Sequence, residues 1–174
     1  TGVQTCALPI CADVNAVEVN KCIVLHFTGW YGRVEVAKVL IENGAEVNAV
    51  DKDKWAALHL AAQNGHDAVA NMLLERGANI NTQSKKGKTA LILAAQSGRD
   101  AIVKALLDRE AEANTLDHIP GYTALMWAAH NGKNEVVKAL LKRRERSQRG
   151  QGITAPAEVN LQNNKGTTAL MLAV

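Results

Sequence analysis

The sequence predicts an all-α solenoid, in which helix-turn-helix units stack side by side and hairpin-like loops connect them. Two segments that recur in phase lead to this prediction. The first is apolar and reads LHFTGWYG, LHLAAQNG, LILAAQSG and LMWAAHNG, beginning at Leu25, Leu58, Leu91 and Leu125. The second ends on asparagine, at Asn15, Asn48, Asn81, Asn114 and Asn160. A period of about 33 residues is typical of repeat proteins, whose units bury their apolar faces only by stacking.

Each unit contains two short stretches with helical periodicity. In the second unit, the first stretch is Ala57–Ala62. In the stretch that follows, Val69 and Leu73 recur at helical spacing. Gly77 comes at the end of that stretch, where a left-handed backbone is easy only for Gly or Asn. Residues 79–88 are polar and lack apolar periodicity, which predicts an exposed loop.

These segments resemble the ankyrin repeat family. The resemblance rests on the period, on the entries Ala-Leu-His and Thr-Ala-Leu, on the Gly between the two helices and on the closing Gly-Ala-x-Val-Asn. It extends over residues 12–174 and implies one ankyrin-repeat domain with stacked helical pairs. We number its units 1 to 4, at residues 16–48, 49–81, 82–114 and 115–160. A partial unit follows at 161–174.

Ankyrin units commonly carry Thr-Pro-Leu-His, in which Thr and His share a hydrogen bond that fixes the turn on the first helix. Here the pair is divided between units. His26 and His59 lack the Thr, whereas Thr89, Thr123 and Thr168 lack the His. We expect both remnants to be structural, because no second ligand at metal spacing accompanies either histidine.

Some units depart from the pattern at glycine positions. Lys21 and Lys54 replace the turn Gly, and Glu110 replaces the Gly that ends the second helix of unit 3. We expect strain or an altered cap at Glu110. Gly29 lies inside a predicted helix, where Gly costs about 1 kcal/mol relative to Ala.

Residues 1–11 do not follow the repeat. Residues Thr1–Ile10, TGVQTCALPI, can be back-translated into a string similar to the common adapter ligated to DNA fragments for short-read sequencing. The last T of that adapter, placed before the rest of a Gly codon, gives the Cys found at Cys11. We therefore expect 1–11 to be a non-native tail and the natural protein to be longer at both ends. The alternative is a short disordered tail.

The composition argues against several classes of protein. With the tail set aside, Cys22 is the one cysteine left, too few for a disulfide framework or a zinc cluster. No apolar run reaches the roughly 18 residues of a membrane span, and the net charge of +3 specifies no partner. The sequence has no Gly-rich phosphate loop and no GxSxG. We expect no enzyme activity, no cofactor and no metal. The compartment stays open, with a soluble, monomeric protein of the cytoplasm expected.

The resemblance also implies where a partner binds. In ankyrin proteins, partners lie across a concave face formed by the loop tips and the exposed side of the first helices. Carried over to this sequence, the variable positions of that face are Trp30, Tyr31, Lys52, Asp53, Trp55, Gln63, Asn64, Lys85, Lys86, Lys88, Gln96, Ser97, Tyr122, His130 and Asn131. The same transfer adds Val19, Asn20, Cys22, Ile119 and Pro120.

The aromatic residues favour recognition of a protein. Of the three Trp, two Tyr and one Phe in the chain, four fall on the variable positions, namely Trp30, Tyr31, Trp55 and Tyr122. Trp and Tyr are frequent hot spots of protein interfaces. We therefore predict a non-catalytic protein–protein interaction module. The alternatives are a targeting or regulatory arm of a larger enzyme or effector, and a passive spacer whose aromatics only pack over neighbouring turns.

Two further features complete the prediction. Phe27 and Trp127 stand where Leu60 and Leu93 stand in other units, so we expect them in the core. Unit 4 carries a basic loop insertion at 143–156, whose Gly and Pro content predicts a solvated loop. A contact with an acidic partner surface is the alternative there. Nucleic acid is not an expected partner, because no aromatic residue for base stacking lies among the arginines.

Overall fold

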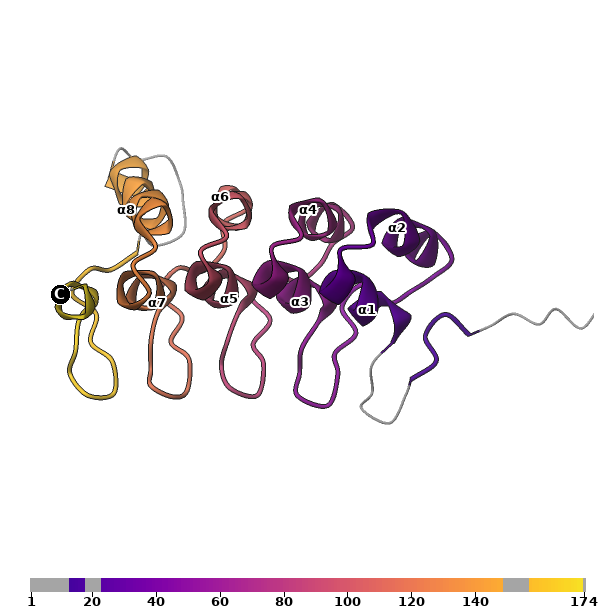
Figure 1. The fold of residues 1–174 in the computed structure, drawn as a ribbon, viewed down its shortest axis with the longest axis horizontal. Helices are drawn as coiled ribbons and strands as arrows, with labels where there is room; N and C mark the ends of the chain where they lie inside the picture. Colours follow the sequence, from indigo (N-terminus) through magenta and orange to yellow (C-terminus); the bar gives the residue numbers. More distant parts are fainter. Residues whose placement is uncertain (1–12, 18–22, 149–156, 174) are drawn as a thin grey trace, which may run out of the picture.

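The computed structural model describes residues 13–17, 23–148 and 157–173. Within these ranges the chain forms nine α-helices and no strand, apart from one isolated bridge between Val50 and Ala56. The helices lie in two rows (Figure 1). The inner row contains α1 (Val24–Tyr31), α3 (Ala57–Asn64), α5 (Ala90–Ser97), α7 (Ala124–His130) and α9 (Ala169–Leu172). The outer row contains α2 (Val34–Glu42), α4 (Asp67–Glu75), α6 (Asp100–Asp108) and α8 (Asn134–Gln148). The predicted all-α solenoid is confirmed.

Threonine begins two of the inner helices. The Thr89 hydroxyl accepts a hydrogen bond from the Ile92 backbone N–H at 3.3 Å, and Thr123 accepts one from Met126 at 3.2 Å. Each bond satisfies an N–H group that has no partner within its own helix. Thr168 makes no such bond at the start of α9.

At α1 and α3, the start of the helix is held by a histidine side chain, which accepts a hydrogen bond from the backbone N–H of the residue before the helix. The Ala56 backbone N–H donates to His59 Nδ1 at 3.0 Å, while Nε2 lies 3.0 Å from the Thr82 carbonyl and 3.2 Å from that of Lys88. His26 bonds in the same manner at the start of α1. Both histidines are buried. The expectation of structural roles is therefore confirmed, and each ring joins its helix to the following loop.

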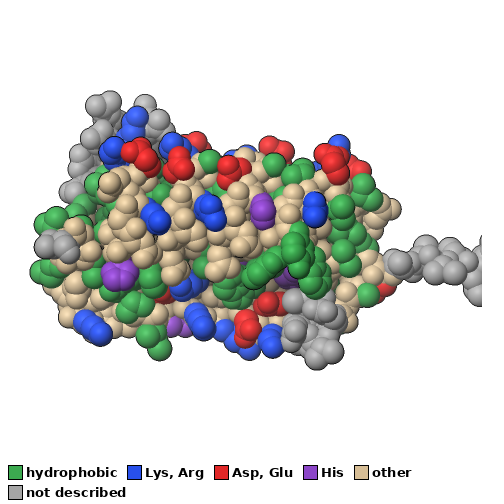
Figure 2. Space-filling view, in the orientation of Figure 1, with side chains coloured by type: hydrophobic (Ala, Val, Ile, Leu, Met, Phe, Trp, Pro, Cys, Tyr) green, Lys and Arg blue, Asp and Glu red, His purple; other side chains and the backbone are tan. Residues whose placement is uncertain are grey.

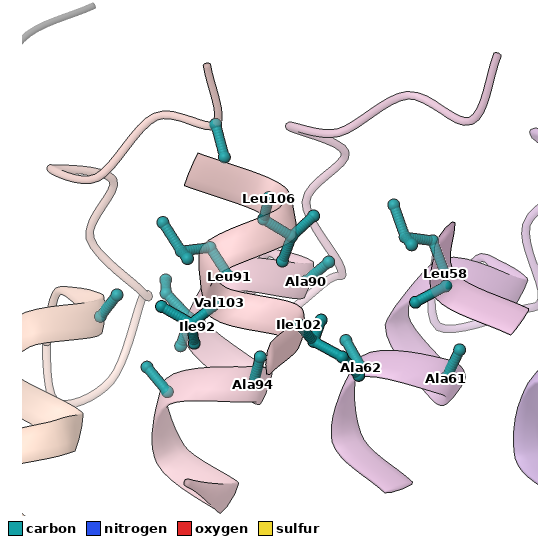
Figure 3. Close-up of a cluster of buried hydrophobic side chains, with 14 of the residues drawn as sticks. Leu58, Ala61, Ala62, Ala90, Leu91, Ile92, Ala94, Ile102, Val103 and Leu106 are labelled. Carbon is teal, nitrogen blue, oxygen red and sulfur yellow. The ribbon is translucent and has the colours of Figure 1, made fainter. Parts of the chain in front are cut away.

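Alanine allows the inner helices to stack closely. Ala61, Ala62 and Ala94 have no exposed surface or almost none, and they lie where neighbouring inner helices meet. Ile102 and Leu106 of α6 cover this layer from the outer row (Figure 3). The core is therefore a continuous layer of small and aliphatic side chains between the two rows, and the apolar face of each unit is buried by its neighbours.

The recurring asparagines link consecutive units. Asn48 Nδ2 donates to the Gly77 carbonyl at 3.1 Å, and Asn48 Oδ1 accepts from the Asn79 backbone N–H at 2.7 Å. The Oδ1 bond to the next unit recurs at Asn15, Asn81 and Asn114. The asparagine marker in the sequence is thus a ladder that fixes each closing turn to the next unit.

The irregular positions have physical explanations. A Cβ atom on Gly29 would meet the Ala57 carbonyl oxygen, so glycine permits α1 to approach α3. Lys54 and Glu110, which replace glycines, have φ angles of 60° and 64°. Side chains other than Gly pay about 1–2 kcal/mol in this left-handed region. The strain expected at Glu110 is confirmed.

The basic insertion differs from the prediction. Helix α8 continues through Gln148, so residues 143–148 are helical where a loop was expected. The cause is composition, because Lys, Arg, Glu and Gln are good helix formers and Gly150 is the first strong helix breaker after α8 begins. The rest of the insertion, the tail 1–11 and the positions Val19, Asn20 and Cys22 lie outside the described residues.

Both ends of the described stack expose apolar side chains. Val24 is 46% exposed on α1, and Leu170 and Met171 are 71% and 63% exposed on α9. A cavity of about 200 Å³ lies between α7, α8 and α9, lined among others by Leu125, Val137 and Leu170. Across the described ranges, no helix combines the length and the apolar character needed to cross a membrane.

Candidate protein-interaction surface

Hairpin loops project from the inner helices, on the side away from the outer row (Figure 1). We call the surface formed by these loops and by the exposed positions of α1, α3, α5 and α7 the inner face. A polar side chain closes each loop from within. Asp51 Oδ1, for example, accepts from the backbone N–H groups of Asp53 and Trp55, both at 2.8 Å. The same position is held by Ser84, Asp117 and Asn163.

The tips of consecutive loops are joined by backbone hydrogen bonds. Lys85 donates to the Asp53 carbonyl at 2.9 Å, His118 donates to that of Lys86 at 2.9 Å, and Asn164 donates to that of Pro120 at 3.3 Å. Four successive tips thus form one connected row. Backbone groups paired in this way hold the tips in fixed relative positions.

Helix α1 presents an aromatic patch on the inner face. Phe27, Trp30 and Tyr31 are 43%, 49% and 60% exposed. Phe27 therefore does not lie in the core, contrary to expectation. Trp55 is half-buried at the next loop, with its ring centroid 5.8 Å from that of His59. Figure 2 shows hydrophobic side chains gathered over α1 and α3.

A second aromatic cluster lies in unit 4. The ring centroids of Tyr122 and Trp127 are 5.1 Å apart, and those of Tyr122 and Trp127 lie 6.0 and 6.2 Å from His130, all in edge-to-face geometry. Trp127 is half-buried, so it is not the fully buried core residue that the sequence predicted. Its indole Nε1 donates to Asp117 Oδ2 at 2.9 Å. Asp117 is buried, so this bond fixes the orientation of the indole, which packs against the core while part of it stays exposed.

Lys88 joins this cluster from unit 3. Its Nζ lies 4.4 Å from the centroid of the Trp127 ring and donates to Gln96 Oε1 at 2.6 Å. An ammonium group over a Trp face is a favourable cation–π pair. Burial lowers the pKa of Lys88, and the charge of Lys86 acts in the same direction, while Asp117 opposes both. The ammonium is therefore held in a partly dehydrated place between two units.

The other predicted positions have different surroundings. Asn64 Nδ2 donates to the Trp30 carbonyl at 3.4 Å, and Asn131 Nδ2 donates to that of Gln96 at 3.1 Å, so both close the end of the preceding inner helix. Gln63 and Ser97 are half-buried outside the two aromatic clusters. The remaining predicted positions, Lys52, Asp53, Lys85 and Lys86, are exposed at the loop tips.

Sequence reasoning missed Phe27, Trp127 and Asp117 as members of this surface. A usable signal was present, since Phe27 precedes Trp30 by three residues and Trp127 precedes His130 by three. Residues at that spacing share a helix face. Among the described residues, no group of three His, Cys, Asp or Glu side chains is arranged to hold a metal ion.

Comparison with known families agrees with this geometry. A family model described as ankyrin repeats (3 copies) matches residues 4–84, 25–117, 78–151 and 111–174. A search of curated proteins gave no match. The overlapping family matches extend over most of the chain, and they fall on the units whose helices, hairpins and asparagine links are described above. The chain belongs to the ankyrin repeat family.

Proposed function

We propose that this chain is a non-catalytic, monomeric recognition module that binds a protein partner across its inner face. Ankyrin repeats generally act as protein–protein interaction modules and are typically not catalytic. For this chain, one observation carries the proposal. All six aromatic residues lie on the inner helices and hairpin loops, whereas the outer helices contain none.

The arrangement of the inner face supports binding with little rearrangement. The loop tips are joined through their backbones, and the Asp117 carboxylate fixes the Trp127 indole. A surface ordered before binding loses less conformational entropy when a partner docks. Rigid aromatic side chains supply most of the binding energy at many interfaces. The inner face has both features, since its loop tips are ordered relative to one another and it carries aromatic side chains.

Trp30 and Tyr31 offer the cleanest test, because both are about half exposed or more. Trp55 and Tyr122 pack against other rings, so their truncation would change stability as well. A random-peptide display library is selected on the wild-type chain, and the affinities of the selected peptides are measured for Trp30→Ser/Tyr31→Ser. We expect a loss of about 2 kcal/mol, or roughly 30-fold, as for hot spots.

The matched control is Val36→Ser/Val39→Ser on the outer helix α2. These valines are 49% and 56% exposed, so the control also removes two exposed apolar side chains. Its affinities should stay within a factor of two of wild type. Peptides that bind the Trp30/Tyr31 variant as tightly as wild type, or a library that yields no binder, would show that the inner face is not a recognition surface.

A further inference from the structure

Lysine side chains gather along the edge of the molecule that the hairpin tips form. Figure 2 shows mainly Lys and Arg, with a few Asp and Glu, along the edge formed by the hairpin tips, whereas charges of both signs lie along the opposite edge over the outer helices. The exposed tip cations are Lys52, Lys54, Lys85, Lys86 and Lys165.

Several cations on and beside the outer helices form ion pairs, although Lys38 on α2 forms none with the described residues. On the outer helices, Arg76 pairs with Glu42 at 3.4 Å and Lys138 pairs with Glu135 at 2.8 Å. Lys104 and Arg109 are paired in the same way, with Asp100 and Glu75.

On the tips, by contrast, Lys85 is the one lysine with an ion pair, to Asp53 at 3.7 Å. Over the part of the chain that the structure describes, Lys52, Lys54, Lys86 and Lys165 have no such partner. Positive charge on the tips is therefore left uncompensated.

Asp53 offsets part of this charge through its ion pair with Lys85, whereas the other loop carboxylates are engaged within the loops. Asp51 uses Oδ1 to accept two backbone N–H bonds, and Asp117 is buried with both oxygens engaged by Gly121, Tyr122 and Trp127. These acids stabilise the loops from within. The outward charge of the tips is accordingly set by lysine.

Apolar groups flank the basic row. The patch of Phe27, Trp30 and Tyr31 lies at one end, and the Tyr122–Trp127 cluster lies at the other. Inner helices packed at about 8–10 Å place units 1 and 4 roughly 25–30 Å apart. An extended peptide of about eight residues spans that distance.

Resting on the function proposed above, we infer that the partner presents an acidic, extended peptide segment, whose carboxylates face the tip lysines and whose apolar side chains contact the two aromatic patches. A nucleic acid fits less well. Duplex DNA carries a charge every ~1.7 Å and is bound by dense rows of cations. The tips instead place Asp53 between Lys52 and Lys54 and a fully outward Ile119, which is 85% exposed, in the same row.

The test uses a fluorescein-labelled peptide with a run of glutamates between two leucines, about eight residues long. Its binding to the full chain is followed by fluorescence anisotropy at low and high salt. We expect binding that weakens as salt shortens the Debye length. A peptide with glutamine in place of glutamate should bind at least ~10-fold more weakly, since the complementary charges are gone.

Charge-reversal variants locate the site. Lys52→Glu/Lys86→Glu should weaken binding of the glutamate peptide at least ~10-fold. Lys38→Glu/Lys142→Glu makes the same change in net charge at exposed lysines of α2 and α8, and it should leave affinity nearly unchanged. Urea midpoints of both variants establish that they are folded.

Three results would overturn the inference: no binding of the glutamate peptide, equal loss in both charge-reversal variants, or equally tight binding of a single-stranded oligonucleotide of similar length. Its failure is separable from failure of the proposed function. Library-selected peptides that are not acidic but depend on Trp30 and Tyr31 would leave the recognition role standing and show that the partner is not acidic.

Discussion

His59 shows how one side chain can replace a missing partner. The backbone N–H of Ala56 donates to Nδ1, so that nitrogen must be unprotonated, and the remaining proton sits on Nε2 facing two carbonyl oxygens. The neutral ring therefore satisfies a helix start and a loop together. If the ring were protonated, Nδ1 would no longer accept a hydrogen bond, and the Ala56 N–H would be left unpaired.

Stability should consequently depend on pH through His59. Burial lowers the pKa of His59 below its ordinary value of 6.5, and backbone hydrogen bonds offset this only in part. Between the folded and the unfolded pKa, the unfolded chain binds more protons, so the free energy of unfolding decreases as pH falls below about 6.5 and on through the folded pKa. Urea midpoints at pH 7.5 and 5.0 measure this loss.

His59→Asn removes the titrating group. We expect the variant to be less stable at pH 7.5 and to lose less stability than wild type on acidification. His130→Asn, at an exposed position, serves as the control. An unchanged difference between pH 7.5 and 5.0 in the His59 variant would rule out His59 as the source.

At the scale of the element, the short helices depend on what surrounds them. Inner helices of seven or eight residues are too short to be stable alone. They persist because caps, hairpins and asparagine links satisfy their ends. Gly29 illustrates the same dependence, since a residue that weakens an isolated helix allows α1 and α3 to come close.

The asparagine ladder gives the prediction at this scale. Asn48→Ala removes two hydrogen bonds between units 1 and 2 while leaving both helices intact. We expect a loss of about 1–2 kcal/mol in the free energy of unfolding, because each net hydrogen bond contributes roughly 0.5–1.5 kcal/mol. Urea denaturation measures it.

Asn71→Ala is the matched substitution, within α4. Its side chain has no hydrogen-bond partner among the described residues, and Ala is the better helix former, so this variant should be as stable as wild type or slightly more stable. Equal destabilisation by the two substitutions would contradict a role for the ladder.

At the scale of the whole molecule, the helices of each described unit pack mainly against those of the adjacent units. Stability in such an array is approximately a sum of unit and interface contributions. Units in the middle have neighbours on both sides, whereas α9 exposes Leu170 and Met171. Local opening should therefore require least free energy at the C-terminal side.

Native-state hydrogen exchange tests this. We expect the slowest exchange for the backbone amides of α3 to α6 and fast exchange over residues 161–173, which have one neighbouring unit in the described structure. Uniform protection as far as α9 would show that the stack opens as a single cooperative unit.

Much of the fold could be predicted from the sequence, whereas fewer of the residues that lie on the inner face could be predicted. Repetition of the apolar and asparagine segments sufficed for the helices, because every unit obeys the same local rules. Phe27 and Trp127 were placed in the core because other units have leucine there. Whether that position is covered depends on neighbouring side chains such as Lys88 and Asp117, which lie at other points of the sequence.

The sequence by itself determined the all-α solenoid and the side of each unit that carries aromatic residues, since these follow from periodicity within one unit. Only the tertiary structure decided how the tips join into one row, why asparagine recurs, and that Lys52, Lys54, Lys86 and Lys165 have no ion pair with the described residues. The physical reason is that hydrogen bonds and ion pairs between units depend on distances across the stack, which no local pattern specifies.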